Sequence, residues 1–371
     1  MSDQIRLYDI DPYQFETEAV LKACLPSGEG MLVLPDRTPF FPGGGGQDPD
    51  PGFIDGLPVR RVVEKEGEVW VEAAGDFHAG DRVHLRIDPL KRRDDAEVHS
   101  GEHILSGTAL RLFAVRNVGF HMGSGYATAD FDRELSQDDL LLLERETNRL
   151  IRENLPVRIS YPAPEELSKL SLRKMPETDE PIRVVTVEGA DNCACCGTHV
   201  RFSGEIGLLR IFSSMRLRGG TRVFFLCGRK ALEASAGETR ILSESASLYS
   251  TSPEKLPEIL GKRLEEERAA KAEIGSLERE LAALLAEKLT RTDEGRVEAT
   301  LSASLSVLRE TAKKICEKEG ASAFLRNGEF YVLAKHPSSK DDLALLNAEL
   351  RKNGARGGGR GDFYSGKLSG E

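Results

Sequence analysis

The distribution of apolar residues changes near residue 90, and this change constrains the fold more than any other feature of the chain. Before it, short apolar runs such as "EGMLVLP" and "DRVHLRID" are broken by Gly, Pro and Asp, a spacing typical of short β-strands. The segment "VVEKEGEVWVE" predicts a hairpin that turns near Gly67. We therefore expect residues 1–90 to form a small N-terminal β-barrel with a glycine-rich loop, "FFPGGGGQDPDPG".

Helices and strands alternate over residues 91–240. The segment "DPLKRRDDAEVHSGEHILSGTALRLF" predicts a long helix, and "SQDDLLLLERETNRLIREN" predicts a second one that Ser136 caps. The segments "PIRVVTVEG" and "GEIGLLRIFSSMRLRGGTRVFFLCG" predict strands, with a hairpin turn at Gly219 and Gly220. Residues 91–240 are therefore expected to form one α+β domain.

The C-terminal part predicts a long helix and a small module. Ile274, Leu277, Leu281 and Leu284 repeat at intervals of three and four, which predicts a helical, coiled-coil-like linker over residues 250–292. Residues 293–371 predict a glycine-rich α/β module that ends in a loop, "GARGGGRGDFYSGK". The whole chain is thus expected to be an α+β multidomain protein.

The composition limits the cellular environment and the partners. The chain has 371 residues, 39% of them hydrophobic and 30% charged, as in soluble globular proteins. No apolar run approaches the roughly 18 residues that span a bilayer. The start, "MSDQIRLYDIDPYQ", lacks the basic and apolar segments of a signal peptide, so we expect a cytoplasmic protein without membrane contact. The net charge of −10 does not exclude a nucleic acid, because phosphates need only a local basic surface.

Two short motifs supply candidate metal ligands. In "HSGEH", His99 and His103 lie four residues apart, so they share one face of the predicted helix. In "CCGTH", Cys195 and His199 are also four residues apart, and Gly197 between them permits a tight turn. Three imidazoles and one thiolate make a complete tetrahedral set, and this combination favours zinc.

Two alternatives at this site stay open on the sequence alone. Cys193 and Cys196 are neighbouring thiols, and either could provide the thiolate. The segment "HSGEH" also matches the H-x-x-E-H signature of a class of metalloproteases. In that interpretation Glu102 is central, and Glu177 or Glu180 is the third ligand. The metalloprotease hypothesis leaves the glycine-rich loop and "CCGTH" unexplained.

Four motifs, in this order along the chain, resemble the alanyl-tRNA editing family, which comprises the editing domain of alanyl-tRNA synthetase and the free-standing AlaX proteins. The glycine-rich loop "FFPGGGGQDPDPG" is similar to the family's Gly-Gly-Gln loop, and "HSGEHILSG" is similar to its H-x-x-x-H helix. The segment "CCGTHV" resembles its C-x-G-T-H motif, and "RVFFLCGRKAL" resembles the strand and turn that follow. The long helix and C-terminal module resemble the end of the synthetase, which indicates the long AlaX type.

The resemblance implies trans-editing, the hydrolysis of the ester that joins serine, or else glycine, to alanine-specific tRNA. It implies a Zn²⁺ cofactor at the Cys/His set. A pocket that hydrogen-bonds the serine hydroxyl would reject alanine, because its polar groups would be left unpaired. A carboxylate close to the metal could act as general base. The predicted substrate-binding residues are Gly45, Gly46, Gln47 and Ser100, and the predicted catalytic residue is Glu102.

The partners follow from local charge and from the long helix. The tRNA is expected to contact clusters of arginine, and a homodimer through the long helix or the C-terminal module is a further prediction. A non-catalytic, zinc-stabilised tRNA-binding protein is the alternative, since it would use the same ligands without an open coordination position. The predicted tRNA-binding residues are Arg92, Arg93, Arg216, Arg218, Arg356 and Arg360.

Overall fold

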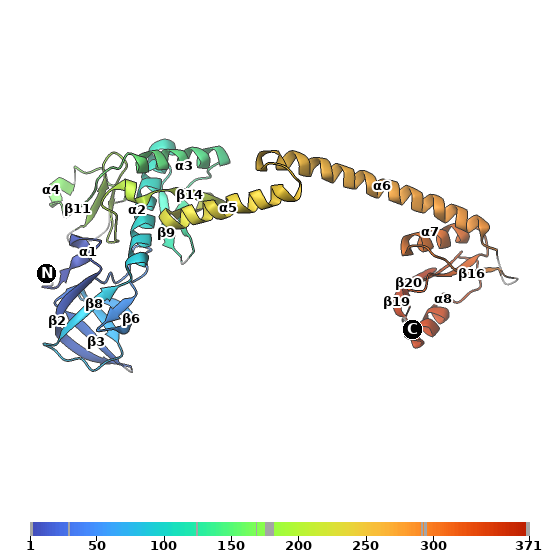
Figure 1. The fold of residues 1–371 in the computed structure, drawn as a ribbon, viewed down its shortest axis with the longest axis horizontal. Helices are drawn as coiled ribbons and strands as arrows, with labels where there is room; N and C mark the ends of the chain where they lie inside the picture. The colour runs from blue at the N-terminus through green and yellow to red at the C-terminus, as the bar shows by residue number, and fades with distance from the viewer. Residues whose placement is uncertain are drawn as a thin grey trace. The chain divides into compact units, whose positions relative to one another are not determined.

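The structure, a computed structural model, describes residues 3–368 except 29, 124, 168, 175–181, 291 and 293–294. It divides into two compact units, residues 1–241 and 242–371, and each is described by itself (Figure 1). Both units combine helices and sheets, which confirms the α+β multidomain class. The finer division at residues 90, 240 and 292 stays a prediction. Among the described residues, no helix is both long enough and apolar enough to cross a bilayer.

The first unit begins with six strands that close into a barrel in the order β2-β3-β7-β6-β5-β8. Their inward-facing apolar side chains form one core. At the predicted hairpin, Glu66 and Gly67 have φ angles of 53° and 75°, as a two-residue turn with right-handed strand twist requires. The elements of this region are β1 (Ile5–Arg6), α1 (Leu7–Ile10), β2 (Glu16–Ser27), β3 (Gly30–Pro35), β4 (Arg37–Thr38), β5 (Gly52–Ile54), β6 (Leu57–Lys65), β7 (Glu68–Ala73) and β8 (Arg82–Ile87).

Helix α2 (Pro89–Phe113) runs from the barrel to the sheets of the same unit (Figure 1). Asp88 caps its N-terminus by accepting hydrogen bonds from the backbone N–H groups of Leu90 and Lys91, and Pro89 occupies the first turn, where its missing N–H costs nothing. Most residues from Arg92 to Ala109 are buried. The helix predicted from the sequence is confirmed, and it is the buried element on which the rest of the unit packs.

Two further sheets surround α2. The four-stranded sheet has the order β14-β15-β10-β9 and the three-stranded sheet the order β11-β12-β13. The predicted cap of α3 is confirmed, because Ser136 and Asp139 form a reciprocal capping box. The elements are β9 (Asn117–Met122), β10 (Ala127–Phe131), α3 (Gln137–Arg152), β11 (Val157–Ser160), α4 (Pro164–Leu167), β12 (Val184–Val187), β13 (Asp191–Ala194), η1 (Ser203–Ile206), β14 (Leu209–Leu217), β15 (Gly220–Cys227) and α5 (Gly228–Leu248).

Three details of this region differ from the prediction. The segment "NVGFHMGSGYATADFD" alternates like a strand, and it forms the antiparallel pair β9 and β10 rather than one strand. The β14–β15 turn consists of Arg218 and Gly219, with φ angles of 46° and 83°, because Gly220 already pairs with Leu217. Helix α5 was not predicted, and the boundary between the two units falls within it.

The second unit contains a long helix and a five-stranded sheet of order β16-β17-β18-β20-β19. The long helix is confirmed. The glycine-rich end, expected as a loop, instead forms the strand pair β19 and β20. Close backbone packing explains its glycines, since a Cβ on Gly359 would lie 2.1 Å from the Phe363 carbonyl oxygen. The elements are η2 (Pro253–Lys255), α6 (Leu256–Lys288), β16 (Arg296–Thr300), α7 (Leu305–Cys316), β17 (Ser322–Arg326), β18 (Phe330–Lys335), α8 (Leu343–Lys352), β19 (Arg356–Arg360) and β20 (Phe363–Lys367).

Replacing Gly107 by Ala tests the packing of α2 on β13. Alanine in a helix interior is normally favoured by about 1 kcal/mol, but a Cβ here would lie 2.2 Å from the Ala190 carbonyl oxygen. We expect Gly107→Ala to lower the free energy of unfolding of the first unit by about 1–3 kcal/mol, measured by chemical denaturation. The control is Gly261→Ala on exposed α6, where a Cβ meets nothing within 4 Å. It should stabilise slightly, and equal effects of the two changes would contradict the tight contact.

Candidate metal centre

Four side chains from two distant segments converge in the first unit. His99 and His103 come from successive turns of α2, and Cys195 and His199 from the loop after β13. Their ligand atoms all lie within 4.8 Å of one another. The Cys195 Sγ is 3.3 Å from His99 Nε2 and 3.4 Å from His199 Nε2. The structure thus brings together the four residues predicted as ligands, and the cluster could hold a metal ion.

Each of the three histidines directs its Nδ1 to a partner within the protein. This leaves every Nε2 facing the cluster, where a deprotonated ring nitrogen can bind a metal. Partners of this kind fix the tautomer and the orientation of ligand histidines. The contacts are His99 Nδ1 to Gln47 Oε1 at 3.1 Å, His103 Nδ1 to Asp191 Oδ2 at 2.9 Å and His199 Nδ1 to Ser100 Oγ at 3.1 Å.

The glycine-rich loop holds Gln47 in place. All four glycines of residues 43–46 have positive φ angles, between 61° and 132°, which other residues rarely adopt. The backbones of Gly44 and Gln47 then pair through hydrogen bonds of 2.9 and 3.0 Å. The Gln47 Nε2 donates to Thr198 Oγ1 at 2.9 Å, and the Thr198 N–H donates to Gln47 Oε1 at 3.1 Å. The Gln47 side-chain amide therefore links His99 to the loop that carries Cys195 and His199.

The predicted substrate-binding residues divide into two groups. Gly45 lines the cavity beside the cluster, where a Cβ would lie 3.9 Å from His99 Cε1. Gly46 packs against Phe120, and a Cβ there would meet the Phe120 carbonyl oxygen at 2.7 Å. Gln47 and Ser100 are buried and bind the ligand histidines. Their side chains therefore orient ligands, and Gly45 is the member of the set that lines the cavity.

The electrostatic environment favours a thiolate at Cys195. Burial by itself raises the pKa of this thiol, but electrostatic interactions with His99 and His199 and hydrogen bonds with His103 and His199 hold the pKa well below its usual value. Burial lowers the pKa of His199 to about 3, which keeps its imidazole neutral. Burial also lowers the pKa of His103, whereas contacts with Asp191 and Cys195 raise it well above the usual range. An anionic sulfur among imidazoles is a strong donor set for a soft cation.

A cavity of about 490 Å³ opens beside the cluster. Such a volume accommodates a small molecule or the end of a larger one. A ligand in this cavity can therefore reach the cluster. Other residues that line the cavity are Gly45, Glu102, Asn117, Phe120 and Arg173.

Glu102 belongs to a buried hydrogen-bond network and is not part of the metal cluster. Its Oε1 accepts from Ser106 Oγ at 2.5 Å and from Asn117 Nδ2 at 2.8 Å. The Arg173 guanidinium donates to both of its oxygens, at 3.3 and 3.4 Å, and also to Asp191 Oδ1 at 3.0 Å. Arg173 therefore connects Glu102 to the carboxylate that contacts His103.

The predicted tRNA contacts at the start of α2 need one correction. Arg92 is fully buried and forms an ion pair with Asp50. It also donates to the backbone carbonyls of Pro12 and Pro39. The guanidinium cannot reach a phosphate, so the prediction for Arg92 is wrong. The other five arginines, Arg93, Arg216, Arg218, Arg356 and Arg360, are exposed.

Sequence reasoning missed the residues that support the ligands. Asp191, Asn117 and Arg173 carry no motif. Asp191 meets His103, and Asn117 meets Glu102, because α2 packs against β13 and β9. Arg173 joins the two carboxylates from a loop. His121 is exposed and does not line the cavity, because its neighbour Phe120 faces His99. The third ligands considered for a metalloprotease, residues 177 and 180, lie outside the described residues.

Comparison with known proteins agrees with the geometry. Residues 182–223 match the family described as the threonyl and alanyl tRNA synthetase second additional domain. Alanine–tRNA ligase of Pyrococcus furiosus is 33% identical over 99% of this chain, which spans 42% of that relative's length. Alanyl-tRNA editing protein AlaX-L of Pyrococcus horikoshii is 28% identical over 98% of this chain and 94% of its own. The Xenopus laevis protein Aarsd1-A, also an alanyl-tRNA editing protein, is 29% identical over 72% of this chain and 66% of its own.

The chain resembles the alanyl-tRNA editing proteins. Its likeness to AlaX-L extends over almost the full length of both chains, as the order of the four motifs predicts. The matched segment 182–223 includes Cys195 and His199. The other two cluster residues, His99 and His103, lie outside that segment and within the region similar to AlaX-L.

Removing the thiolate tests the ligand set. We expect Cys195→Ala to lower bound metal by about tenfold or more, because it deletes the anionic donor, measured by elemental analysis of purified protein. The matched control is Cys196→Ala, since this neighbouring thiol is exposed and outside the cluster. Full metal content in Cys195→Ala, together with loss in Cys193→Ala, would assign the thiolate to Cys193 instead.

Proposed function

We propose that this protein is a trans-editing enzyme that hydrolyses the ester of tRNA(Ala) mischarged with serine, with a zinc ion at the Cys/His cluster. The observation that carries the proposal is the cluster of three imidazoles and one thiolate at the edge of a cavity. The names of AlaX-L and Aarsd1-A, both alanyl-tRNA editing proteins, support the same reaction. The cytoplasm, where tRNA is charged, is the compartment expected for it.

Zinc is the ion that this donor set fits best. A tetrahedral zinc ion with Zn–N near 2.0–2.1 Å and Zn–S near 2.3 Å separates its ligand atoms by roughly 3.3–3.6 Å. The two sulfur–nitrogen distances, 3.3 and 3.4 Å, are slightly shorter than the roughly 3.5–3.6 Å that these bond lengths give for a sulfur–nitrogen pair. A thiolate disfavours magnesium and calcium, which prefer oxygen ligands.

Orientation of the ester is the main contribution of the chain's own residues. The aminoacyl ester is intrinsically reactive, so positioning relative to a water molecule supplies much of the rate. The cavity offers the Gly45 backbone and the side chains of Asn117 and Glu102 as polar groups. When bound, zinc supplies Lewis acidity or binds and orients the substrate. Polar groups that pair with a serine hydroxyl would remain unpaired with alanine, which favours serine over alanine.

The RNA would be held by exposed arginines. In the first unit these are Arg93, Arg216 and Arg218, and in the second unit Arg356 and Arg360. Arg356 and Arg360 stand at the two ends of the edge strand β19, whose residues are all exposed. Each would contact phosphate without reading sequence.

A homodimer through α6 is part of the proposal. Ile274, Leu277, Leu281 and Leu284 follow heptad spacing and are 44–58% exposed, although α7 packs on the same helix and buries Ala282 between them. Heptad-spaced apolar side chains are buried when a second helix packs on them. A second copy of the chain would therefore cover this stripe.

The reaction is tested with three charged forms of tRNA(Ala). Serine-charged tRNA(Ala) should be deacylated, the alanine ester should persist, and the glycine ester measures the remaining tolerance of the pocket. Removal of the metal with a chelator should abolish hydrolysis, and added zinc should restore it. The readout is loss of radiolabelled amino acid from the tRNA. Tight tRNA binding without any turnover would instead indicate a binding protein, and cleavage of a peptide without deacylation would indicate a protease.

Glu102→Gln distinguishes a general base from a positioning residue. A general base contributes typically 10²–10⁴-fold to the rate. Because both Glu102 oxygens already accept from neighbouring donors, we expect a loss in kcat of less than about tenfold, with unchanged metal content. A loss beyond a hundredfold at full metal content would assign the proton transfer to Glu102.

A further inference from the structure

A groove on the barrel is not explained by the metal centre. It has a volume of about 600 Å³ and lies where β2, β5 and β8 meet the start of α2. All of its residues belong to the first unit. The lining residues used below are Tyr13, Phe15, Glu16, Phe53, Arg86 and Asp88.

Flat aromatic and guanidinium groups line this groove. Arg86 and Phe53 are directly opposite each other on β8 and β5, and the Arg86 guanidinium lies 5.4 Å from the centre of the Phe53 ring. On the other side, Arg93 of α2 lies 5.5 Å from the Tyr13 ring and 5.4 Å from the Phe15 ring. The groove thus holds the Arg86–Phe53 pair, and Arg93, which lines a neighbouring pocket that shares Tyr13, forms a second cation–ring pair beside it.

The two guanidinium groups keep their charge available. Within the described part of the chain, neither Arg86 nor Arg93 forms an ion pair with a carboxylate, and both are exposed. Of the two acidic residues of the groove, Glu16 is exposed and directly opposite Arg86 on β2, and Asp88 is engaged by the start of α2. Glu16 lies 3.6 Å from His84 Nε2, and Asp88 accepts the backbone N–H groups that begin α2. A ligand with negative charge and flat apolar faces would complement this surface.

We propose that the groove binds an unpaired nucleotide of the tRNA acceptor arm, with its base against the aromatic rings and its phosphate at Arg86 and Arg93. Unstacked RNA bases are commonly bound on aromatic rings and on guanidinium planes. This inference rests on the proposed function, because the acceptor arm carries the ester. Pro89 at the groove and His99 at the cluster are ten residues apart on α2, or about 15 Å along the helix. That distance suits two contacts with one RNA arm.

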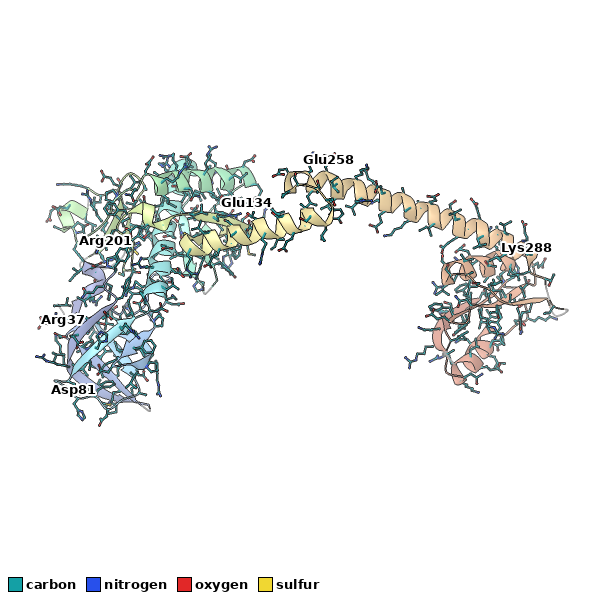
Figure 2. The ribbon with its side chains drawn as sticks, in the orientation of Figure 1. Arg37, Asp81, Glu134, Arg201, Glu258 and Lys288 are labelled. Carbon is teal, nitrogen blue, oxygen red and sulfur yellow. The ribbon has the colours of Figure 1, made fainter. Side chains whose placement is uncertain are left out.

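Arg201 marks the limit of the groove toward the metal centre. Its guanidinium lies 5.1 Å from the Tyr13 ring, and it forms an ion pair with Asp11 at 2.7 Å. It is labelled in Figure 2, and it follows the ligand His199 by two residues. Tyr13 is thus in contact with one arginine from α2 and one from the segment that follows His199.

Binding of uncharged RNA tests the proposal independently of hydrolysis. The probes are uncharged tRNA(Ala) and a hairpin of its acceptor arm with the single-stranded 3′ end, measured by fluorescence anisotropy with the full chain. We expect Phe53→Ala and Arg86→Ala each to weaken hairpin binding about tenfold, as loss of a stacked base does. Arg86→Ala should also lower the slope of log Kd against log salt by about one, and Phe53→Ala should leave the slope unchanged.

The controls keep charge and fold constant. Arg82→Ala removes an exposed arginine of the same strand that does not line the groove, and it should bind RNA as the unchanged protein does. Arg86→Lys keeps the charge but loses the planar group, so the salt slope should persist while affinity falls. Circular dichroism and metal content, expected to be unchanged, show that each variant is folded.

Three results would overturn the inference: no RNA binding by the unchanged protein, equal affinity in all variants, or displacement of the RNA by polyglutamate with the same sensitivity to the variants. The last result would identify an acidic protein as the occupant. If the groove variants lose RNA binding while the unchanged protein deacylates no mischarged tRNA, the proposed function fails and the groove inference stands.

Discussion

The buried ion pair between Arg92 and Asp50 fixes the glycine-rich loop against α2, and the metal cluster depends on it. Both side chains are fully buried, and the Asp50 carboxylate also accepts the Phe41 N–H at 2.6 Å. Arg92 further binds the carbonyls of Pro12 and Pro39. Breaking such a buried pair by removing one partner typically costs about 3–5 kcal/mol, because a charge is left uncompensated. The pair thus holds both ends of the loop that presents Gln47 to His99.

Buried polar contacts also hold the cluster histidines in place. Gln47 contacts His99 and Thr198, Ser100 contacts His199, and Asp191 contacts His103. Every contact joins segments that lie far apart in the sequence, so the cluster geometry is a product of tertiary packing. Glycine is needed where the ligand loop approaches α2 most closely. A Cβ on Gly197 would lie 2.1 Å from His99 Cε1, and only a residue without one lets the ligand loop close over the helix.

The four cluster residues could be predicted from the sequence more readily than the residues that contact and orient them. His99 and His103, like Cys195 and His199, are four residues apart, and a motif of this kind is visible because the residues that share the metal are also close in sequence. Helices α2 and α3 were predictable for the same reason, since caps and periodicity are local signals. Asp191 and Arg173 were not predictable, because their roles arise from contacts between β13, α2 and a loop. Arg92 was assigned to the surface on its charge, and only its partner Asp50, 42 residues earlier, explains its burial.

The contacts of Glu102 differ from those that its protease-like motif would require. In sequence it stands inside a protease-like signature, but the cluster takes its third and fourth ligands from "CCGTH". A protease would need this carboxylate free to bind water, whereas Ser106, Asn117 and Arg173 donate to it. With Arg173 between them, Glu102 and Asp191 form a charged network around one cation. The charge of the Glu102 carboxylate helps to neutralise the Arg173 guanidinium. Asp191 can therefore contact both His103 and Arg173. The helix that carries two ligands thus also carries the carboxylate that steadies the partner of one of them.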